Sequence, residues 1–260
     1  MKPLAVLAGV AALSSAVSLA VADPPRYSLA DLKALVAQRS YPEAVAHLSD
    51  IAPGERKADW LAVAVDAASG YLDGLAADDL ATKVWSIEAL DAQYPQLLTQ
   101  PRYTKVRADI GLRGYEACFA RSEVLDACLR HATRFLDADA GNTELAFKLA
   151  KVLRRSSNPD VSVPFFKRAV AGKPSAAMCK DDALQSAVLA GLGLPAEHDR
   201  AADARAIASG ACFDPLKPAI LEALDAEVPG GPVHGNACAL MKGKRALDAT
   251  QTRSCDKKKR

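Results

Sequence analysis

The sequence predicts an all-helical protein built from antiparallel helical hairpins. Two apolar stripes at helical spacing mark the clearest hairpin, which runs from Thr143 to Ala176; they are Leu145, Leu149 and Leu153, then Val163, Phe166 and Val170. A break separates the stripes at residues 156–159, where Pro159 cannot continue a helix. The composition agrees with this class, because apolar residues make up 50% of the 260 residues and aromatic residues only 5%.

The net charge of the chain and its distribution limit the kind of partner that the protein is expected to bind. The net charge is +2, and the last four residues, Lys257, Lys258, Lys259 and Arg260, are all basic, so the rest of the chain is close to neutral. A nearly neutral body without basic stripes argues against nucleic acid as the principal partner. A basic end of this kind is able to contact anionic envelope polymers or lipid headgroups, with an attraction that falls as salt rises, but a run of charges at a chain end is more often simply solvated. The alternative is a solvated end with no specific role.

The central hairpin resembles a tetratricopeptide repeat, a 34-residue helix-turn-helix unit. The family positions of acceptable type are Leu149, Ala150, Leu153, Ser162, Phe166, Ala169 and Pro174. The first position departs from the pattern, because the usual Trp is Ala146 here. The resemblance implies a right-handed α-solenoid of stacked hairpins whose first helices line a concave binding face. An unrelated hairpin in an ordinary helical domain remains the alternative.

Residues 1–22 are predicted to be a signal peptide. Lys2 supplies the positive start, residues 4–17 an apolar run, and Ala20 and Ala22 a small-x-small cleavage pattern before Asp23. The residue directly after that site is Asp23 rather than Cys, which disfavours a lipid anchor. No later segment has about 20 uninterrupted apolar residues. The leader resembles a bacterial one, so we expect a periplasmic or secreted protein. An uncleaved N-terminal anchor is the alternative.

The mature chain is expected to form a helical repeat domain over residues 23–228. A degenerate hairpin spans Ser28–Asp50, where Ser28 and Asp31 form a capping pattern. Before the central hairpin, further helices are expected at residues 57–72, 78–94 and 103–120, and a degenerate unit at 109–142. After the central hairpin, helices are expected from Cys179 to about 189, from about 199 to Cys212, and at 219–227. Trp60, Trp85, Tyr71 and Tyr94 are expected to fill the core rather than to form a carbohydrate or peptide platform.

Residues 229–260 are expected to form a linker, a small cysteine-bridged cap and the basic tail. The linker is the Pro and Gly cluster at 229–232, and the cap holds a helix-like segment at 237–250.

Six cysteines in an exported chain predict three disulfides, for which the sequence alone allows 15 pairings. We expect local pairs, because each pair then faces across one hairpin or flanks one segment. These pairs are Cys118 with Cys128, Cys179 with Cys212, and Cys238 with Cys255. Each disulfide would contribute about 2 to 4 kcal/mol by constraining the unfolded chain.

A metal site is the alternative for the first pair, because Cys128 and His131 have C-x-x-H spacing with Cys118 nearby. No fourth ligand is evident, and structural zinc requires four. We therefore expect neither a metal nor a cofactor, and we interpret His47, His198 and His234 as surface or partly packed residues.

No catalytic signature is found. The sequence holds no nucleophile elbow, no H-E-x-x-H and no P-loop, and Gly191 and Gly193 lack the third glycine of a dinucleotide fingerprint. The sequence therefore predicts a non-enzymatic interaction scaffold that binds a protein or peptide. By the family resemblance, the candidate partner-binding residues are Lys148, Lys151, Arg154 and Arg155, which would favour an acidic partner or a C-terminal carboxylate. Changing Lys148 and Lys151 to Glu should weaken capture. The alternative is a structural envelope protein that associates through its basic tail.

Overall fold

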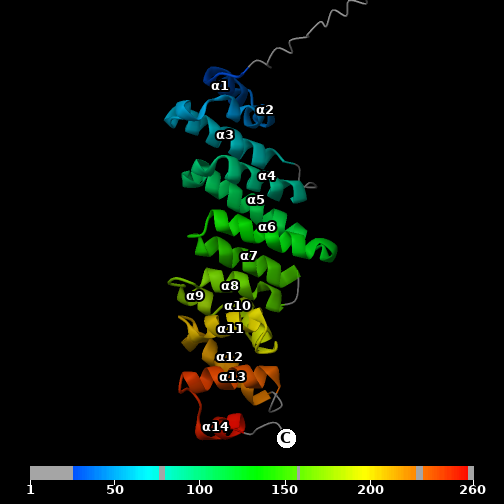
Figure 1. The fold of residues 1–260 in the computed structure, drawn as a ribbon, viewed down its shortest axis with the longest axis vertical. Coiled ribbons are helices and arrows are strands. Elements are labelled where there is room, and N and C mark those ends of the chain that lie inside the picture. Colours follow the sequence, from blue (N-terminus) through cyan, green and yellow to red (C-terminus); the bar gives the residue numbers. More distant parts are fainter. Residues whose placement is uncertain (1–25, 76–79, 157–158, 227–230, 257–260) are drawn as a thin grey trace, which may run out of the picture.

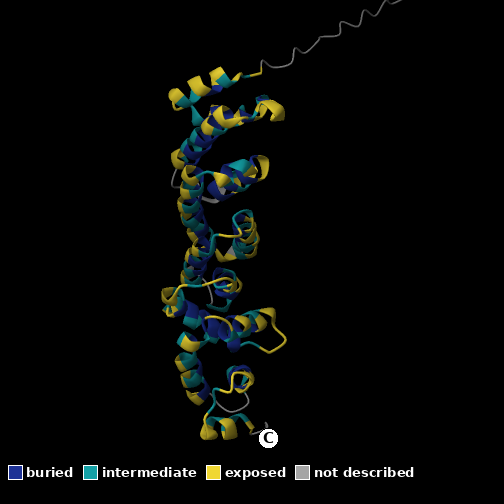
Figure 2. Cartoon of the chain, turned by 90° about the vertical axis from the view of Figure 1, so that its left-hand side faces the viewer, coloured by how far each residue is buried: buried dark blue, intermediate teal, exposed yellow. Residues whose placement is uncertain are grey.

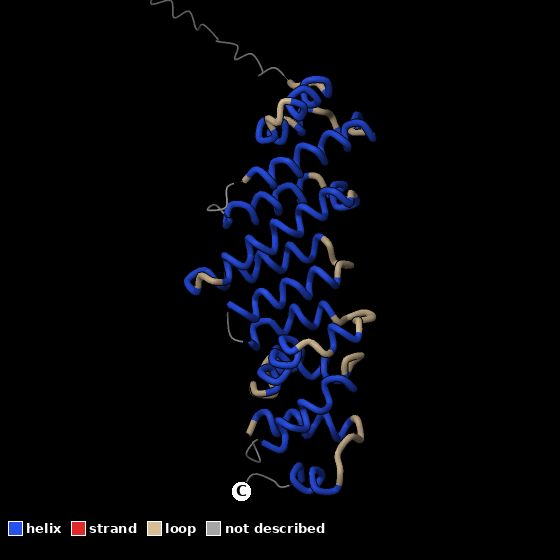
Figure 3. The backbone as a smooth tube through the Cα atoms, turned by 180° about the vertical axis from the view of Figure 1, so that it is seen from behind, coloured by secondary structure: helices blue, strands red, loops and turns tan. Residues whose placement is uncertain are grey.

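A computed structural model describes residues 26–75, 80–156, 159–226 and 231–256. These residues form an all-helical structure, with 80% helix and no strand within the described ranges (Figure 3). The predicted fold class is confirmed at this level, and the right-handed solenoid stays a prediction. The predicted signal peptide and the basic tail lie outside the described residues.

The helices are stacked along the longest axis of the molecule, with the first and last described helices at opposite ends (Figure 1). Seen from the side, they form two layers, and exposed residues lie on the outer sides of the stack (Figure 2). Most helices that follow one another in the chain pack together, and α3, α5 and α7 also contact in succession.

The first half of the stack holds α1 (Leu29–Ala37), α2 (Tyr41–Ala46), α3 (Ala58–Gly74), α4 (Leu80–Gln93), α5 (Pro101–Phe119) and α6 (Leu125–Ala138). The second half holds α7 (Thr143–Ser156), α8 (Val163–Ala169), α9 (Ala176–Cys179), α10 (Asp182–Leu192), α11 (Asp199–Ser209), α12 (Phe213–Ala226), α13 (Pro232–Gly243) and α14 (Ala249–Asp256). Short 3₁₀ turns lie between several of these helices, among them η5 (Pro159–Ser162).

The N-terminal hairpin forms as its capping pattern predicts. Ser28 and Asp31 make a complete capping box at the start of α1, which satisfies two backbone N–H groups that have no partner within the helix. Arg39 adopts a positive φ of 61° in the turn to α2. The ring of Tyr41 then packs so closely on Gly70 of α3 that a Cβ atom at Gly70 would collide with it. This contact explains how the short α2 is held against α3.

Five of the six residues in the two predicted stripes of the central hairpin are buried, and the sixth, Val170, is partly buried. Leu149, Leu153 and Phe166 are fully buried, and so is Ala150, the small residue expected where helices approach closely. The second helix differs in one respect, because Ser162 lies in η5 rather than in the α-helix. Its hydroxyl donates to the carbonyl of Pro159, which stabilises the tighter turn ahead of α8.

The predicted boundaries are wrong near the C-terminal end. The helix expected to begin at residue 219 begins at Phe213 and contains Pro218, so prolines did not mark its start. The segment expected as one helix over 237–250 is divided between α13 and α14. The division follows from local chemistry: Arg245 has a φ of 52°, and Asp248 accepts hydrogen bonds from the backbone N–H groups of Thr250 and Gln251 to begin α14.

The structure pairs all six cysteines as the sequence predicts, and it leaves no free cysteine in the described residues. The Cα atoms are 5.9 Å apart in Cys118–Cys128, 5.0 Å in Cys179–Cys212 and 5.5 Å in Cys238–Cys255. All three distances lie in the range of ordinary disulfides. The bonds therefore link α5 to α6, α9 to the start of α12, and α13 to α14.

A buried polar network, which the sequence did not predict, ties α4, α5 and α6 together. Arg107 donates through Nε to Oδ2 of Asp91 at 2.8 Å and through Nη2 to the carbonyl of Phe135 at 2.6 Å. The hydroxyl of Tyr103 donates to Oδ1 of Asp91 at 2.8 Å. Arg107, Tyr103 and Phe135 are fully buried, so these bonds lie away from water.

No helix in the described ranges combines the length and the apolar character that a membrane span requires.

Candidate partner-binding groove

A groove of about 630 Å³ lies between one face of α7 and the segment that contains α9. Its lining residues are Glu144, Phe147, Lys148, Lys151, Val152, Arg155, Ser175 and Met178. The six that belong to α7 recur three or four positions apart, which places them on neighbouring turns of one helix face. The apolar lining residues, here called the floor, are Phe147, Val152 and Met178. The charged ones, here called the border, are Glu144, Lys148, Lys151 and Arg155.

Three of the four predicted partner-binding residues line this groove. Lys148 and Arg155 are exposed, with 55% and 69% of their side chains accessible, and Lys151 lies between them along the helix. The sequence reasoning therefore placed three cations on one face, but it missed the apolar floor. Met178 could not have been found that way, because it reaches the groove only through the packing of α9 against the stack.

Arg154 is directed elsewhere. Its Nη2 donates to the hydroxyl of Ser186 on α10 at 2.9 Å, and Arg154 does not line the groove. It lies on another side of α7 because successive residues of a helix point about 100° apart. We therefore assign Arg154 to packing between α7 and α10 rather than to partner binding.

Each cation of the groove already has an acidic neighbour. Lys148 pairs with Glu144 at 2.9 Å on the same helix, and this hydrogen bond and the lysine's charge lower the pKa of the Glu144 carboxyl below its usual value. Arg155 lies 3.9 Å from Glu116 of α5. Exposed pairs of this kind contribute about 0 to 1 kcal/mol, so a partner carboxylate can displace either acid at small cost.

Lys151 is held more firmly than the other two cations. Its Nζ lies 2.6 Å from Oδ2 of Asp181, and the two side chains are 36% and 20% exposed. Asp181 also caps α10, because its Oδ1 accepts a hydrogen bond from the backbone N–H of Ala183. The Lys151 ammonium lies 5.7 Å from the ring centre of Phe147. Lys151 thus supports the groove from the α10 side, which leaves Lys148 and Arg155 as the cations open to a partner.

The alternative metal site at the first cysteine pair is not what the structure contains. Cys118 and Cys128 are bonded to each other, and Nδ1 of His131 contacts the two carboxylate oxygens of Glu88 at 2.8 and 3.0 Å.

Four aromatic residues were expected in the core, and for Trp85 this prediction is wrong, because Trp85 is 56% exposed. Its ring centre lies 6.0 Å from that of His131.

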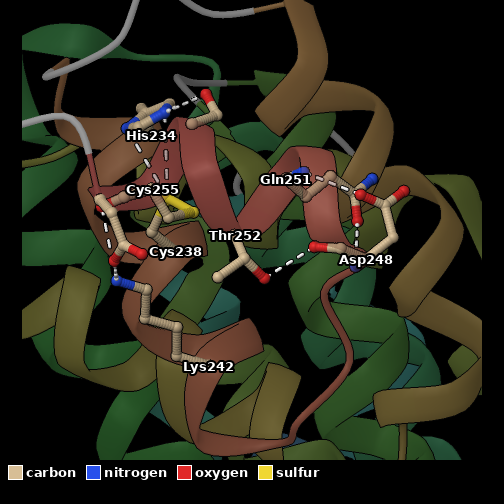
Figure 4. Close-up of a disulfide and its surroundings, with 9 residues drawn as sticks. His234, Cys238, Lys242, Asp248, Gln251, Thr252 and Cys255 are labelled. Carbon is tan, nitrogen blue, oxygen red and sulfur yellow. Dashed lines mark hydrogen bonds and ion pairs between the residues drawn. A yellow bond between two sulfur atoms is a disulfide. The ribbon is translucent and has the colours of Figure 1, made fainter.

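Another histidine departs from expectation. His234, interpreted from the sequence as a surface or partly packed residue, is only 4% exposed and lies against the disulfide between Cys238 and Cys255 (Figure 4). The spacing from His234 to Cys238 is visible in the sequence as one helical turn, but the approach of Cys255 depends on how α14 folds back on α13.

Comparison with protein-family models, with curated protein sequences and with solved structures finds no match for this chain.

Proposed function

We propose that this chain is an exported, non-enzymatic interaction scaffold that captures a protein segment in the groove of α7. The proposal includes the resemblance to tetratricopeptide repeats, in which hairpins stack into a right-handed solenoid and first helices face the partner. Here α7 is the first helix of the best-matching unit. Three intramolecular disulfides support an oxidising compartment such as the periplasm or the cell exterior.

The observation that carries the proposal is the combination of an apolar floor with two exposed cations on one helix face. This combination fits a segment that presents one apolar side chain next to a carboxylate, either an acidic residue or a chain end. Burying a side chain of the size of Leu on the floor contributes about 1.5 to 3 kcal/mol. An exposed ion pair adds at most about 1 kcal/mol. The floor therefore supplies most of the affinity, while Lys148 and Arg155 orient the segment.

The test is cross-linked capture from a cell-envelope extract, using the chain from residue 23 and a groove variant with Lys148→Glu and Arg155→Glu. Lys151 is left unchanged, because Lys151→Glu would set two carboxylates against each other at Asp181 and weaken the fold itself. The matched control is Lys105→Glu, which reverses an exposed charge on α5 away from the groove. We expect one discrete protein to be captured by the wild type and the control, and to be lost with the groove variant.

A second variant separates the floor from the border. Met178→Gln keeps the length of the side chain and makes it polar, so it should weaken capture at least as much as the charge reversal. Equal capture by all variants would overturn the groove as the binding site.

A third form of the chain ends at Asp256 and lacks the basic tail. If only wall or lipid material is recovered, and recovery is lost with the tail, the chain is instead a structural envelope protein. That outcome would leave the repeat resemblance as architecture alone.

A further inference from the structure

A histidine lies against the disulfide at the C-terminal end of the stack. Sγ of Cys238 lies 3.7 Å from Nδ1 and 3.8 Å from Nε2 of His234 (Figure 4). The ligand atoms of His234, Cys238 and Cys255 all lie within 4.8 Å of one another. Within the described ranges, this is the one group of three metal-ligating residue types gathered so closely.

We propose that, once the Cys238–Cys255 bond is reduced, these two thiolates and His234 bind a thiophilic metal ion of the Zn²⁺ class. Zinc binds Cys sulfur at about 2.3 Å and His nitrogen at about 2.0 to 2.1 Å in tetrahedral geometry, which places two such ligands about 3.6 Å apart. The distances between the sulfur of Cys238 and the ring nitrogens already match this separation. The two sulfur atoms have to move apart, and the imidazole of His234 has to turn so that one ring nitrogen faces the ion, because the sulfur now lies almost equally far from both nitrogens. The nitrogen Nε2 also lies 3.3 Å from the hydroxyl of Ser254.

The backbone already holds the three residues close to one another. His234 and Cys238 are one turn apart on α13, and the Cα atoms of Cys238 and Cys255 are 5.5 Å apart. Both His234 and Cys238 are buried, so the ion would lie in a site of limited water access. Cys255 is partly exposed, which gives a reductant a path to the bond. Three protein ligands leave a fourth position for water or an incoming ligand.

The chemical step is a thiol–disulfide exchange with a dithiol reductant. The Cys238–Cys255 bond breaks, a disulfide forms in the reductant, and the two protons of the reductant pass to the cysteine sulfurs. Binding of the ion then releases both thiol protons to solvent, because the thiolate is the ligand.

The metal would replace the disulfide as the link that holds α14. None of the residues of α14 is buried, so this helix contributes little core of its own. Besides the disulfide, α14 is held to α13 by exposed contacts such as the ion pair of Lys242 with Asp256 at 2.5 Å. Reduction should therefore loosen α14, and metal binding should fix it again.

The test uses the full chain, reduced under native conditions with a phosphine, which takes up oxygen from water as it is oxidised. Co²⁺ serves as the probe, because thiolate ligands give it a sulfur-to-cobalt charge-transfer band. We expect the reduced chain to bind one Co²⁺ with this band, Zn²⁺ to displace it, and the oxidised chain to show no band. Tryptic cleavage at Arg253 in α14 should be fast in the reduced chain and slowed when Zn²⁺ is added.

Two matched variants assign the site. Reduced Cys238→Ser/Cys255→Ser lacks a bond between α13 and α14, as the reduced wild type does, but it has no thiolates at the site and should lose the band. His234→Ala should weaken binding about tenfold or more. His131→Ala is the control, because it alters the histidine near the other candidate set, Cys118 and Cys128. Absence of the band in the reduced wild type would overturn the proposal. So would binding that depends on His131 or survives in the double serine variant.

Discussion

Removal of the carboxylate of Asp91 should destabilise the fold strongly, because it would leave a buried guanidinium without its counter-charge. The side chains of Arg107 and Asp91 are only 1% and 6% exposed, and the charged atoms Nη2 and Oδ2 are 2.7 Å apart. In Asp91→Ala, Arg107 keeps only the carbonyl of Phe135 among its present acceptors, and the hydroxyl of Tyr103 loses its own acceptor. Breaking a buried pair from one side costs about 3 to 5 kcal/mol.

A double-mutant cycle tests the cause. Arg107→Met with Asp91→Leu removes both charges and keeps apolar volume, so it should cost much less than the sum of the two single changes. The free energy of unfolding is measured by urea titration with circular dichroism. Hydrogen exchange in α4, α5 and α6 is followed as well, since stacked helices can unfold in segments. Lys105→Ala, an exposed change on α5, should stay within about 0.5 kcal/mol of the wild type.

A loss of less than about 1 kcal/mol in Asp91→Ala, the value expected for an exposed ion pair, would contradict a buried charge pair. A double variant that loses the full sum of the two single losses would contradict the pair as well, because the two charges would then act independently.

Three further predictions concern other parts of the stack. Gly111→Ala should cost about 1 to 3 kcal/mol in urea titration, because its Cβ would collide with the buried ring of Phe135; an unchanged midpoint would contradict this packing. Burial raises the pKa of the Tyr103 hydroxyl above its ordinary value of 10.0, so this hydroxyl stays protonated in the folded chain at pH values where it ionises in the unfolded chain. The stability of the fold should therefore decrease as pH rises above about 10. In Tyr103→Phe, the melting temperature should decrease less steeply between about pH 9 and 11, and a slope equal to that of the wild type would contradict this prediction. Ser28→Ala should cost about 1 kcal/mol, seen as faster hydrogen exchange in α1, because its capping box with Asp31 is lost; unchanged exchange there would speak against the cap.

Much of the fold follows from local signals in the sequence. The capping pattern at Ser28 marks the start of α1, and apolar spacing finds the buried face of α7 at Leu149 and Leu153. The cysteine pairs follow because each closes a hairpin or a short segment, so that only local geometry is needed. The ends of helices were harder to predict, because proline usually marks a helix boundary but Pro218 lies inside α12.

The candidate sites were predictable only in part, because their residues meet through packing. Helical spacing brought Lys148 and Arg155 to one face, but the place of Met178 in the groove depends on how α9 packs against α10 and α12. The pair of Asp91 with Arg107 joins α4 to α5, and no local pattern links two residues on different helices. Likewise Cys255 reaches His234 only because the chain turns back after α13.

The three disulfides also determine how the molecule would respond to a pulling force. The described helices begin at one end of the long axis and finish at the other, so tension applied to the two ends acts along the whole stack (Figure 1). Each disulfide prevents the segment between its two cysteines from being extended, and these cysteines are 10, 33 and 17 positions apart. The helices from α1 to α4 contain none of these bonds and can unravel completely under load, while the enclosed segments keep their length. Reduction of Cys238–Cys255 would release only the segment between these two cysteines. A thiol reductant would therefore increase the length to which the C-terminal end can be extended.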